Sequence, residues 1–466
     1  MSLPATASTL KGENCREIAE WIIANFKSHY LNDRGLISRT YPVTDRTIFD
    51  NFDDLAPFFL YYGEIDFLLE QINRLGPDPF DALLPFNNII YSYYIDEYLG
   101  GMCSLFRRTN KPKVKRLLDD AVAKCLNYFV ADDVLLEFYD LTTKKSSPYS
   151  SPWSSGLLET FLEMLDIYPQ LLGLVVGIVH HWLGNRFYLK EGLFPCRSSN
   201  HPFYYFFGQL NASRKTYRKD CPILPAGHQT SLLSRIKYQA RKNFYLYASS
   251  GHFVQLMKSN TTMIFTLIEL FRLTGDSCYR EHITQWINAC FSKLVKDGTV
   301  YGHYYINGHV DKPGLVNSFI LIDVLCDTYW FVDRDQKYLH WAMDIAERQL
   351  ANQWANGLLP MYEGSDRDHL DHQVDFAVSL RRIGELTGDA GYLQGSRDLM
   401  ENALRFHRVE NGFCTHVDSE GNPIYLPVNM VDPKYNALLL KGLILLSEEK
   451  SSVYENEFLR ELLKDR

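Results

Sequence analysis

The sequence lacks any segment that marks a secreted or membrane protein. Its first residues, Met1-Ser2-Leu3-Pro4, contain no basic stretch followed by an apolar one, which a signal segment requires. No run reaches the roughly 18 apolar residues of a membrane span. The longest apolar stretch, residues 171–179, is short and ends at His180-His181. We therefore expect a soluble, cytoplasmic protein with no membrane partner.

The chain also has fewer basic than acidic residues. The formal net charge is −8 and the isoelectric point is about 6.0. Nucleic-acid binding requires a basic surface, so we expect no nucleic-acid partner. The nine cysteines are scattered, odd in number and never spaced as Cys-x-x-Cys. This pattern predicts reduced thiols, with neither a disulfide framework nor a zinc site.

Motifs that bind cofactors are missing as well. The chain has no glycine-rich phosphate loop, no His-Glu-x-x-His and no Gly-x-Ser-x-Gly. We predict no cofactor and no metal site.

A long internal repeat is present instead. An apolar run at 264–271 ends in Thr274-Gly275-Asp276, an amphipathic run follows, and a glycine loop at 297–302 completes the unit. The unit recurs, with Thr387-Gly388-Asp389 as a second copy of the turn. The matched tyrosines Tyr279, Tyr338 and Tyr392 lie 59 and 54 residues apart. A period of this length with two helical runs per unit indicates stacked helical hairpins.

The repeat predicts an all-α fold, a closed (α/α)6–7 toroid with short strands in its rim loops. Counting from Asn51 gives about seven hairpins, and the last pairs 435–446 with 453–463. We expect a single domain over residues 1–466, since each hairpin buries its apolar face only against its neighbours. Residues 196–253 are basic, aromatic and weakly periodic, which indicates an insertion into that domain.

The longer loops of the repeat should gather at one rim of the toroid. The Thr-Gly-Asp turns are short, whereas the glycine loops are longer and lead into the next inner helix. Long loops on one face make that face variable and functional. Carboxylates, imidazoles, tyrosines and arginines recur after the glycine loops, so we expect a polar pocket there.

The Leu-Thr-Gly-Asp-x-x-Tyr turns and Asn-Gly-Leu loops resemble those of the (α/α) toroid carbohydrate-active enzymes. That group includes six- and seven-hairpin glycosidases, N-acylglucosamine 2-epimerase and glucuronyl C5-epimerases. The segment Pro152-Trp153-Ser154-Ser155-Gly156 is similar to a Pro-Trp-x-Ser-Gly segment of the C5-epimerases. The resemblance implies the fold and a saccharide or glycoconjugate substrate, and it transfers no catalytic residue.

Carboxyl groups on the rim make glycoside hydrolysis the favoured hypothesis. Cleavage of a glycosidic bond requires one protonated and one ionised carboxyl. We nominate Asp54, Glu363 and Asp371 as the leading carboxyls, with His372 beside them. The structural alternatives are that Asp53 and Asp54 cap a helix opening near residue 50, and that the acids of 363–371 belong to a solvated loop.

Other rim residues are candidates for substrate binding. Tyr41, Trp153, Tyr304 and Tyr362 would stack on a sugar ring, because aromatic faces suit sugars. Arg39 and His372 would position the substrate. The remaining nominees are three acids and a histidine: Asp53, Glu97, Glu159 and His303. Glu97 and Glu159 lie within apolar inner helices, where burial raises a carboxyl pKa unless a salt bridge compensates.

Rival hypotheses use the same scaffold. A sugar epimerase or polysaccharide lyase would transfer protons with His303, His369, His372 and tyrosines. A non-catalytic glycan-binding protein would leave the rim acids solvated. Asp366, Asp368, Asp371 and His372 could bind a divalent cation, although their spacing matches no established loop. A terpenoid cyclase is weaker, because Asp50-x-x-Asp53-Asp54 matches neither Asp-Asp-x-x-Asp nor Asp-x-Asp-Asp.

Overall fold

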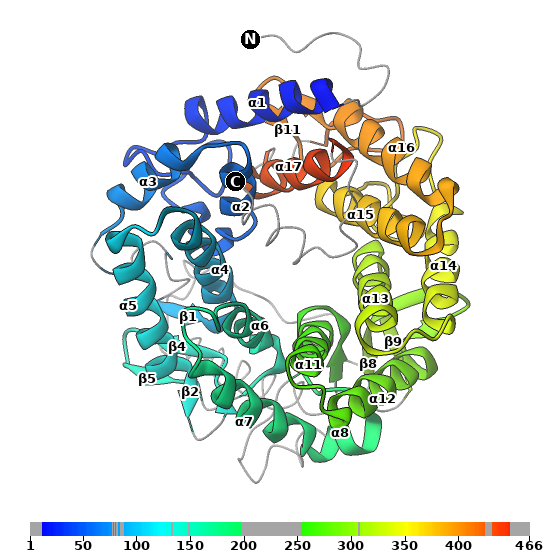
Figure 1. Ribbon diagram of the computed structural model, residues 1–466. Helices are drawn as coiled ribbons and strands as arrows, with labels where there is room; N and C mark the ends of the chain where they lie inside the picture. Colours follow the sequence, from blue (N-terminus) through cyan, green and yellow to red (C-terminus); the bar gives the residue numbers. More distant parts are fainter. Residues whose placement is uncertain are drawn as a thin grey trace, which may run out of the picture.

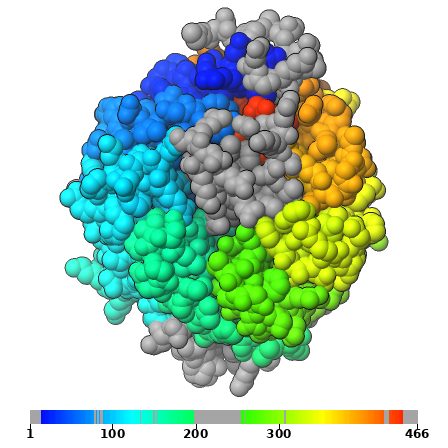
Figure 2. Space-filling view, viewed as in Figure 1, coloured from blue at the N-terminus to red at the C-terminus, as the bar shows by residue number. Residues whose placement is uncertain are grey.

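The computed structural model describes residues 12–76, 78, 80, 83, 88–131, 134–147, 150–196, 253–305, 308–424 and 431–447. Within these ranges the chain forms two concentric layers of helices (Figure 1). Figure 2 shows successive hairpins following one another around the molecule in chain order.

Seven helices of the described chain form the inner layer, and each contacts the next around a ring. They are α2 (Ala56–Tyr61), α4 (Ser92–Thr109), α6 (Gly156–Glu163), α11 (Thr261–Thr274), α13 (Leu315–Asp327), α15 (Leu370–Thr387) and α17 (Pro433–Ser447). Contacts between α17 and α2 close the ring. The described part of the chain is therefore an (α/α) toroid, as the repeat predicts.

An outer helix packs against each inner one (Figure 1). The outer helices are α1 (Gly12–Ser28), α3 (Ile65–Arg74), α5 (Pro112–Phe129), α7 (Leu171–Leu183), α12 (Ser277–Lys293), α14 (Lys337–Leu350) and α16 (Ala390–Phe406), with a short α8 (Arg186–Glu191) beside α7. The partner of α17 is α1, from the other end of the described chain. The sequence predicts a partner at 453–463, and those residues lie outside the described ranges.

The short turns between inner and outer helices owe their form to glycine and aspartate. Gly275 and Gly388 end α11 and α15 with φ angles of 68° and 75°, which glycine adopts without strain. Asp276 then accepts a hydrogen bond from the Cys278 amide at 2.9 Å and caps α12. Asp389 caps α16 in the same way. In each Thr-Gly-Asp turn the glycine thus ends the inner helix and the aspartate caps the outer helix that follows.

The longer loops are clamped to the inner helices by buried amides. The side chain of Gln373 on α15 accepts from the Leu359 amide at 3.0 Å and donates to the Leu359 carbonyl at 2.7 Å. Asn436 on α17 makes the same pair of bonds with Phe413, and Asn260 makes it with Phe194. A buried amide that satisfies both backbone groups fixes where each loop crosses the rim.

Short antiparallel strands lie in these connections, as predicted. They are β1 (Ile89–Tyr91), β2 (Val130–Ala131), β3 (Val134–Leu135), β4 (Phe138–Asp140), β5 (Lys145–Ser146), β6 (Phe253–Gln255), β7 (Val295–Lys296), β8 (Thr299–Tyr305), β9 (Val310–Pro313), β10 (Arg408–Val409) and β11 (Gly412–Phe413). The largest sheet has the order β6-β8-β7, and β9 also pairs with β8. In its register Gln255 and Asp311 flank His303. The sheet therefore places His303 between β6 and β9, and β8 packs against α13 and α14.

One expectation about membranes needs correction. The stretch Leu315–Val332 is 18 residues long and apolar enough to cross a membrane by length and composition, and 56% of it is buried within the protein. It comprises α13 and the π-helical turn η5 (Thr328–Val332) of the inner ring. Its Asp323 and Asp327 form ion pairs with Arg382 of α15, which suits a core helix better than a lipid-facing one. The predicted insertion at 196–253 lies almost entirely outside the described residues.

Candidate active site

Residues of α6, α11, α13, α15 and α17 and of the turn before α2 line a cavity of about 420 Å³, which we call the central cavity. One end of it is lined by Asp54, Asp371 and Lys434, which lie at or just before the N-terminal ends of α2, α15 and α17. Acidic side chains also enter from α6, α11, α13 and α15, and Phe265, Phe319 and Phe331 add apolar faces. A cavity of this volume with mixed apolar and charged walls is typical of a small-ligand site.

Asp53 and Asp54 lie in a turn before α2 and cap no helix. The preceding 3-10 turn η1 (Ile48–Asn51) ends before them, and α2 begins at Ala56 without a side-chain cap. The predicted helix opening near residue 50 is therefore wrong, and N-capping does not explain the pair. Instead, the Asp53 amide donates to the Glu97 carbonyl at 2.9 Å, and the Asp54 amide donates to Asp53 Oδ1 at 2.8 Å.

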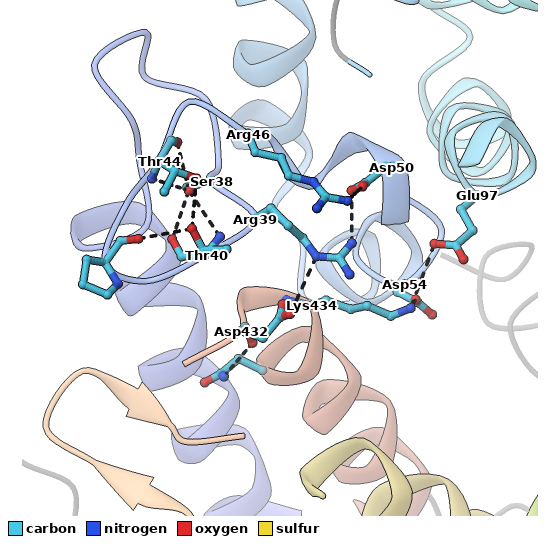
Figure 3. Close-up of polar contacts among 12 residues, drawn as sticks. Ser38, Arg39, Thr40, Thr44, Arg46, Asp50, Asp54, Glu97, Asp432 and Lys434 are labelled. Atoms are coloured by element: carbon cyan, nitrogen blue, oxygen red, sulfur yellow. Dashed lines mark hydrogen bonds and ion pairs between the residues drawn. The ribbon is translucent and has the colours of Figure 1, made fainter. Parts of the chain in front are cut away.

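Lys434 of α17 reaches into this acidic turn (Figure 3). Its ammonium lies 2.8 Å from Asp54 Oδ2 and 4.0 Å from Glu97 Oε2. One oxygen from each of Asp53, Asp54 and Glu97 lies within 4.8 Å of the other two. The lysine ammonium supplies the positive charge that such a cluster requires.

The pKa values of the two consecutive aspartates move in opposite directions. Burial is the largest influence on both and favours the neutral form. For Asp54, Lys434 together with Lys441 and Arg39 outweighs burial and lowers the pKa. For Asp53, the neighbouring Asp54 and Glu97 add to burial and hold the pKa well above its ordinary value. The surroundings therefore favour the ionised form of Asp54 and the neutral form of Asp53.

Asp371 faces the same cavity from the first turn of α15. Burial raises its pKa, Lys434 acts against this, and the negative charge of Asp54 adds to the rise. The N-cap position of α15 is His369, which makes no side-chain cap, so Asp371 has no capping role there either. The surroundings thus lower the pKa of Asp54 and raise that of Asp371 within one cavity, a division that suits base and acid roles.

Two glycines of α4 let the aspartate turn approach so closely. A Cβ at Gly101 would lie 2.5 Å from the Phe52 carbonyl carbon, which is a backbone clash. We expect Gly101→Ala to destabilise the protein by about 2 kcal/mol, because the clash with backbone can be relieved only by displacing the turn. Gly173→Ala is the matched control: its Cβ meets nothing within 4 Å, and alanine favours the helix. Urea denaturation of both variants checks this, and equal stabilities would contradict it.

A second cavity of about 510 Å³, the side cavity, adjoins the first through Met257 and Val316. His303 of β8 and His372 of α15 both line it, as does the half-exposed Tyr362. Burial lowers the pKa of His303 to about 4 and that of His372 to about 3. Both imidazoles are therefore neutral at physiological pH and able to accept a proton.

His372 belongs to a cluster of rings on the rim. His369 stacks on His372 with centroids 4.5 Å apart and planes at 24°, and it also contacts His416 and Tyr435. One potential metal-ligating atom from each of His369, Asp371 and His372 lies within 4.8 Å of the other two. A shared metal ion requires ring lone pairs that converge on one point, whereas stacked rings direct theirs along nearly parallel lines. The arrangement is thus better suited to stacking than to chelation.

The alternative cation site at Asp366, Asp368, Asp371 and His372 does not assemble. Asp366 is exposed, with 92% of its side chain accessible. Asp368 is fully buried and turned toward His407, whose Nε2 lies 2.6 Å from Asp368 Oδ2. These two aspartates therefore do not point to the same place as Asp371 and His372.

The structure leaves several other nominated residues away from both cavities. Glu363 is exposed and pairs with Arg348 of α14 at 2.8 Å. Tyr304 alternates with His303 along β8, so its ring lies under Lys293 near Glu191. Arg39 is held between Asp50 and Asp432 (Figure 3).

The remaining nominees divide between the cavity wall and the surrounding structure. Glu159 lines the central cavity, whereas Glu97 lies beside Lys434. The Tyr41 hydroxyl accepts a hydrogen bond from Asn411 at 3.0 Å. Trp153 is part of the 3-10 turn η3 (Pro152–Ser155), and its side chain lies outside the described part of the structure.

Sequence reasoning missed the cationic wall of α17. Lys434 and Lys441 are seven residues apart and therefore share one helix face, and Lys441 pairs with Asp375 at 3.2 Å. Its position in the sequence could have indicated Lys434. This lysine follows Asp432-Pro433 at the start of an inner helix, and the acids were nominated because they precede or open inner helices.

Comparison with known proteins gives structural relatives only. No protein-family model matches the sequence, and no curated protein is recognisably similar to it in sequence. An α-1,2-mannosidase from Trichoderma reesei superposes with a TM-score of 0.64 at 11% identity, covering 94% of this chain and 93% of the mannosidase. A D-mannose isomerase gives 0.58 at 11% identity, covering 96% and 99%. A cellobiose 2-epimerase from Bacillus thermoamylovorans gives 0.54 at 12% identity, covering 92% and 98%.

These similarities define a class by its fold. The chain has the (α/α) toroid architecture shared by glycosidases, sugar isomerases and sugar epimerases, as its turns and loops predict. At 11–12% identity the relatives establish the architecture alone. The chemistry depends on the side chains that this chain places in its cavities.

Proposed function

We propose that the protein is a carbohydrate-active enzyme that hydrolyses a glycosidic bond in the central cavity. One observation carries the proposal: Asp54 and Asp371 line the same cavity with pKa values displaced in opposite directions. Asp371 would donate a proton to the leaving oxygen, and the Asp54 carboxylate would activate water or attack the sugar. Phe265 and Phe319 would give the sugar an apolar face.

A sugar isomerase or epimerase is the second candidate, and the side cavity favours it. His303 and His372 are neutral imidazoles on two walls of that cavity. One imidazole could remove a proton next to a carbonyl, and the imidazolium so formed could return that proton to the neighbouring carbon. The names of the structural relatives include both kinds of enzyme, so the two candidates require a direct test.

The test uses α-1,2- and α-1,6-linked manno-oligosaccharides and free mannose, since several relatives act on mannose-containing sugars. Each would be incubated with the protein in 18O-labelled water and, separately, in deuterium oxide. Hydrolysis predicts shorter saccharides carrying one 18O atom at the cleaved anomeric carbon. Deuterium on a sugar carbon without cleavage would favour the isomerase. Calorimetric binding without any product would favour a non-catalytic glycan-binding protein.

We also propose a cytoplasmic location. The eight cysteines within the described ranges are free thiols, and all but Cys278 are buried. Free thiols agree with a reducing compartment.

A further inference from the structure

The central cavity runs along the axis of the inner ring. Three inner helices each line it with residues eleven positions apart: Thr261 and Arg272 on α11, Val316 and Asp327 on α13, Asp371 and Arg382 on α15. At 1.5 Å per residue this span is roughly 16 Å. The cavity is therefore deep, with Asp54 and Asp371 at one end and Arg272, Asp327 and Arg382 at the other.

Ion pairs occupy the end of the cavity opposite Asp54 and Asp371. Arg382 donates to Asp323 at 2.8 Å and also contacts Asp327, and only 6% of its side chain is exposed. Ser379 donates to the same Asp323 carboxylate at 3.0 Å. Arg272 pairs with Glu269 at 2.8 Å while its guanidinium lies 4.1 Å from the Phe331 ring. Both arginines are thus already matched to protein carboxylates.

Among the residues that the structure describes, acidic groups outnumber basic groups along the cavity. These residues contribute eight acidic side chains and four basic ones to its wall. Glu159 and Glu163 enter from α6, which contributes no basic side chain to the wall. Even with a proton on Asp371, the wall carries an excess of negative charge in a partly desolvated space, where charges interact strongly.

We infer that the central cavity selects sugars by charge, binding an amino sugar more tightly than its neutral counterpart and excluding uronic acids. An ammonium group on the sugar would gain from the acidic excess. A uronate carboxylate would meet like charge, which weakens its binding in a partly desolvated site. Arginine would be its natural partner, and both cavity arginines are committed to Asp323, Asp327 and Glu269. This inference rests on the proposal that the cavity holds a saccharide.

The experiment is calorimetry on the full chain with three matched probes: mannose, mannosamine and mannuronate. We expect mannosamine to bind about fivefold tighter than mannose and mannuronate at least about tenfold weaker, with both differences shrinking in high salt. Glu163→Gln should reduce the mannosamine-to-mannuronate ratio about threefold, because it removes one wall charge. Glu281→Gln, on the exposed face of α12, is the control and should leave the ratio unchanged.

The possible outcomes separate this inference from the proposed function. Mannuronate binding as tightly as mannose would overturn the charge selection while leaving a saccharide site in place. A ratio unaffected by Glu163→Gln would also overturn it. If neither these sugars nor the manno-oligosaccharides bind, the saccharide site itself is refuted, and the selection with it.

Discussion

Replacing Asp371 by asparagine is expected to reduce turnover about 10³-fold, the usual contribution of a positioned proton donor. Asparagine has nearly the same shape but cannot donate the proton whose binding the raised pKa of Asp371 favours. Asp54→Asn should cause a loss of similar size, because it removes the ionised carboxylate of the pair. Steady-state rates on the cleaved manno-oligosaccharide measure both losses.

The pH dependence of kcat/KM provides a second test of the roles of Asp54 and Asp371. Activity should require Asp54 ionised and Asp371 protonated, so kcat/KM should fall in acid as Asp54 gains a proton. It should fall again at higher pH as Asp371 loses its proton. Asp371→Asn should remove the alkaline limb from the residual activity.

Glu363→Gln is the matched control for both substitutions. Glu363 belongs to the same acid-rich stretch of sequence, yet it is exposed and pairs with Arg348. Its replacement should leave turnover within about twofold, because exposed ion pairs contribute little. If Glu363→Gln abolished activity while Asp371→Asn did not, the assignment of the acid would be wrong.

His407→Asn is expected to destabilise the protein by about 3–5 kcal/mol, the cost of breaking a buried ion pair. His407 is fully buried, with Nε2 2.6 Å from Asp368 and Nδ1 2.8 Å from the Cys414 carbonyl. Burial opposes its charge, but Asp368 outweighs burial and raises the pKa to about 10. Both ring nitrogens therefore donate. Without the imidazolium, Asp368 would remain buried and without its charged partner.

The same pair sets a pH dependence of stability. The pKa of His407 is higher in the folded protein than the ordinary value of 6.5, so its protonation stabilises the fold fully below pH 6.5. This contribution is lost as the pH rises toward 10. Urea denaturation at pH 6.5 and 9.5 should show a fall in the free energy of unfolding that His407→Asn lacks.

His340→Asn, an exposed position on α14, is the control for this measurement and should retain both stability and slope. A His407→Asn protein as stable as wild type at pH 6.5, or one with the same slope, would contradict the ion-pair account.

The architecture could be predicted from the repeat, because the residues of a turn act on their immediate neighbours in the chain. Gly275 and Asp276 each act within a few residues, so their roles follow from spacing alone. The meeting of Asp54 and Asp371 was also predictable, because both precede or open inner helices whose N-terminal ends share one rim.

The rest of the site depends on contacts that spacing does not encode. Lys434 reaches Asp54 only because α17 closes the ring beside α2. Glu363 was nominated from loop composition, which does not distinguish a cavity wall from solvent. Tyr304 was nominated beside His303, although neighbours along a strand face opposite sides.

The packing of α1 on α17 has a consequence for how the chain folds during its synthesis. An open stack of hairpins has two end units that fray independently, whereas a circle has none. The seam joins segments separated by about 400 positions, so loop-closure entropy opposes it and it should form late. A nascent chain would therefore expose the apolar seam of its first hairpins until α17 has left the ribosome, a period in which chaperones would have the most to bind.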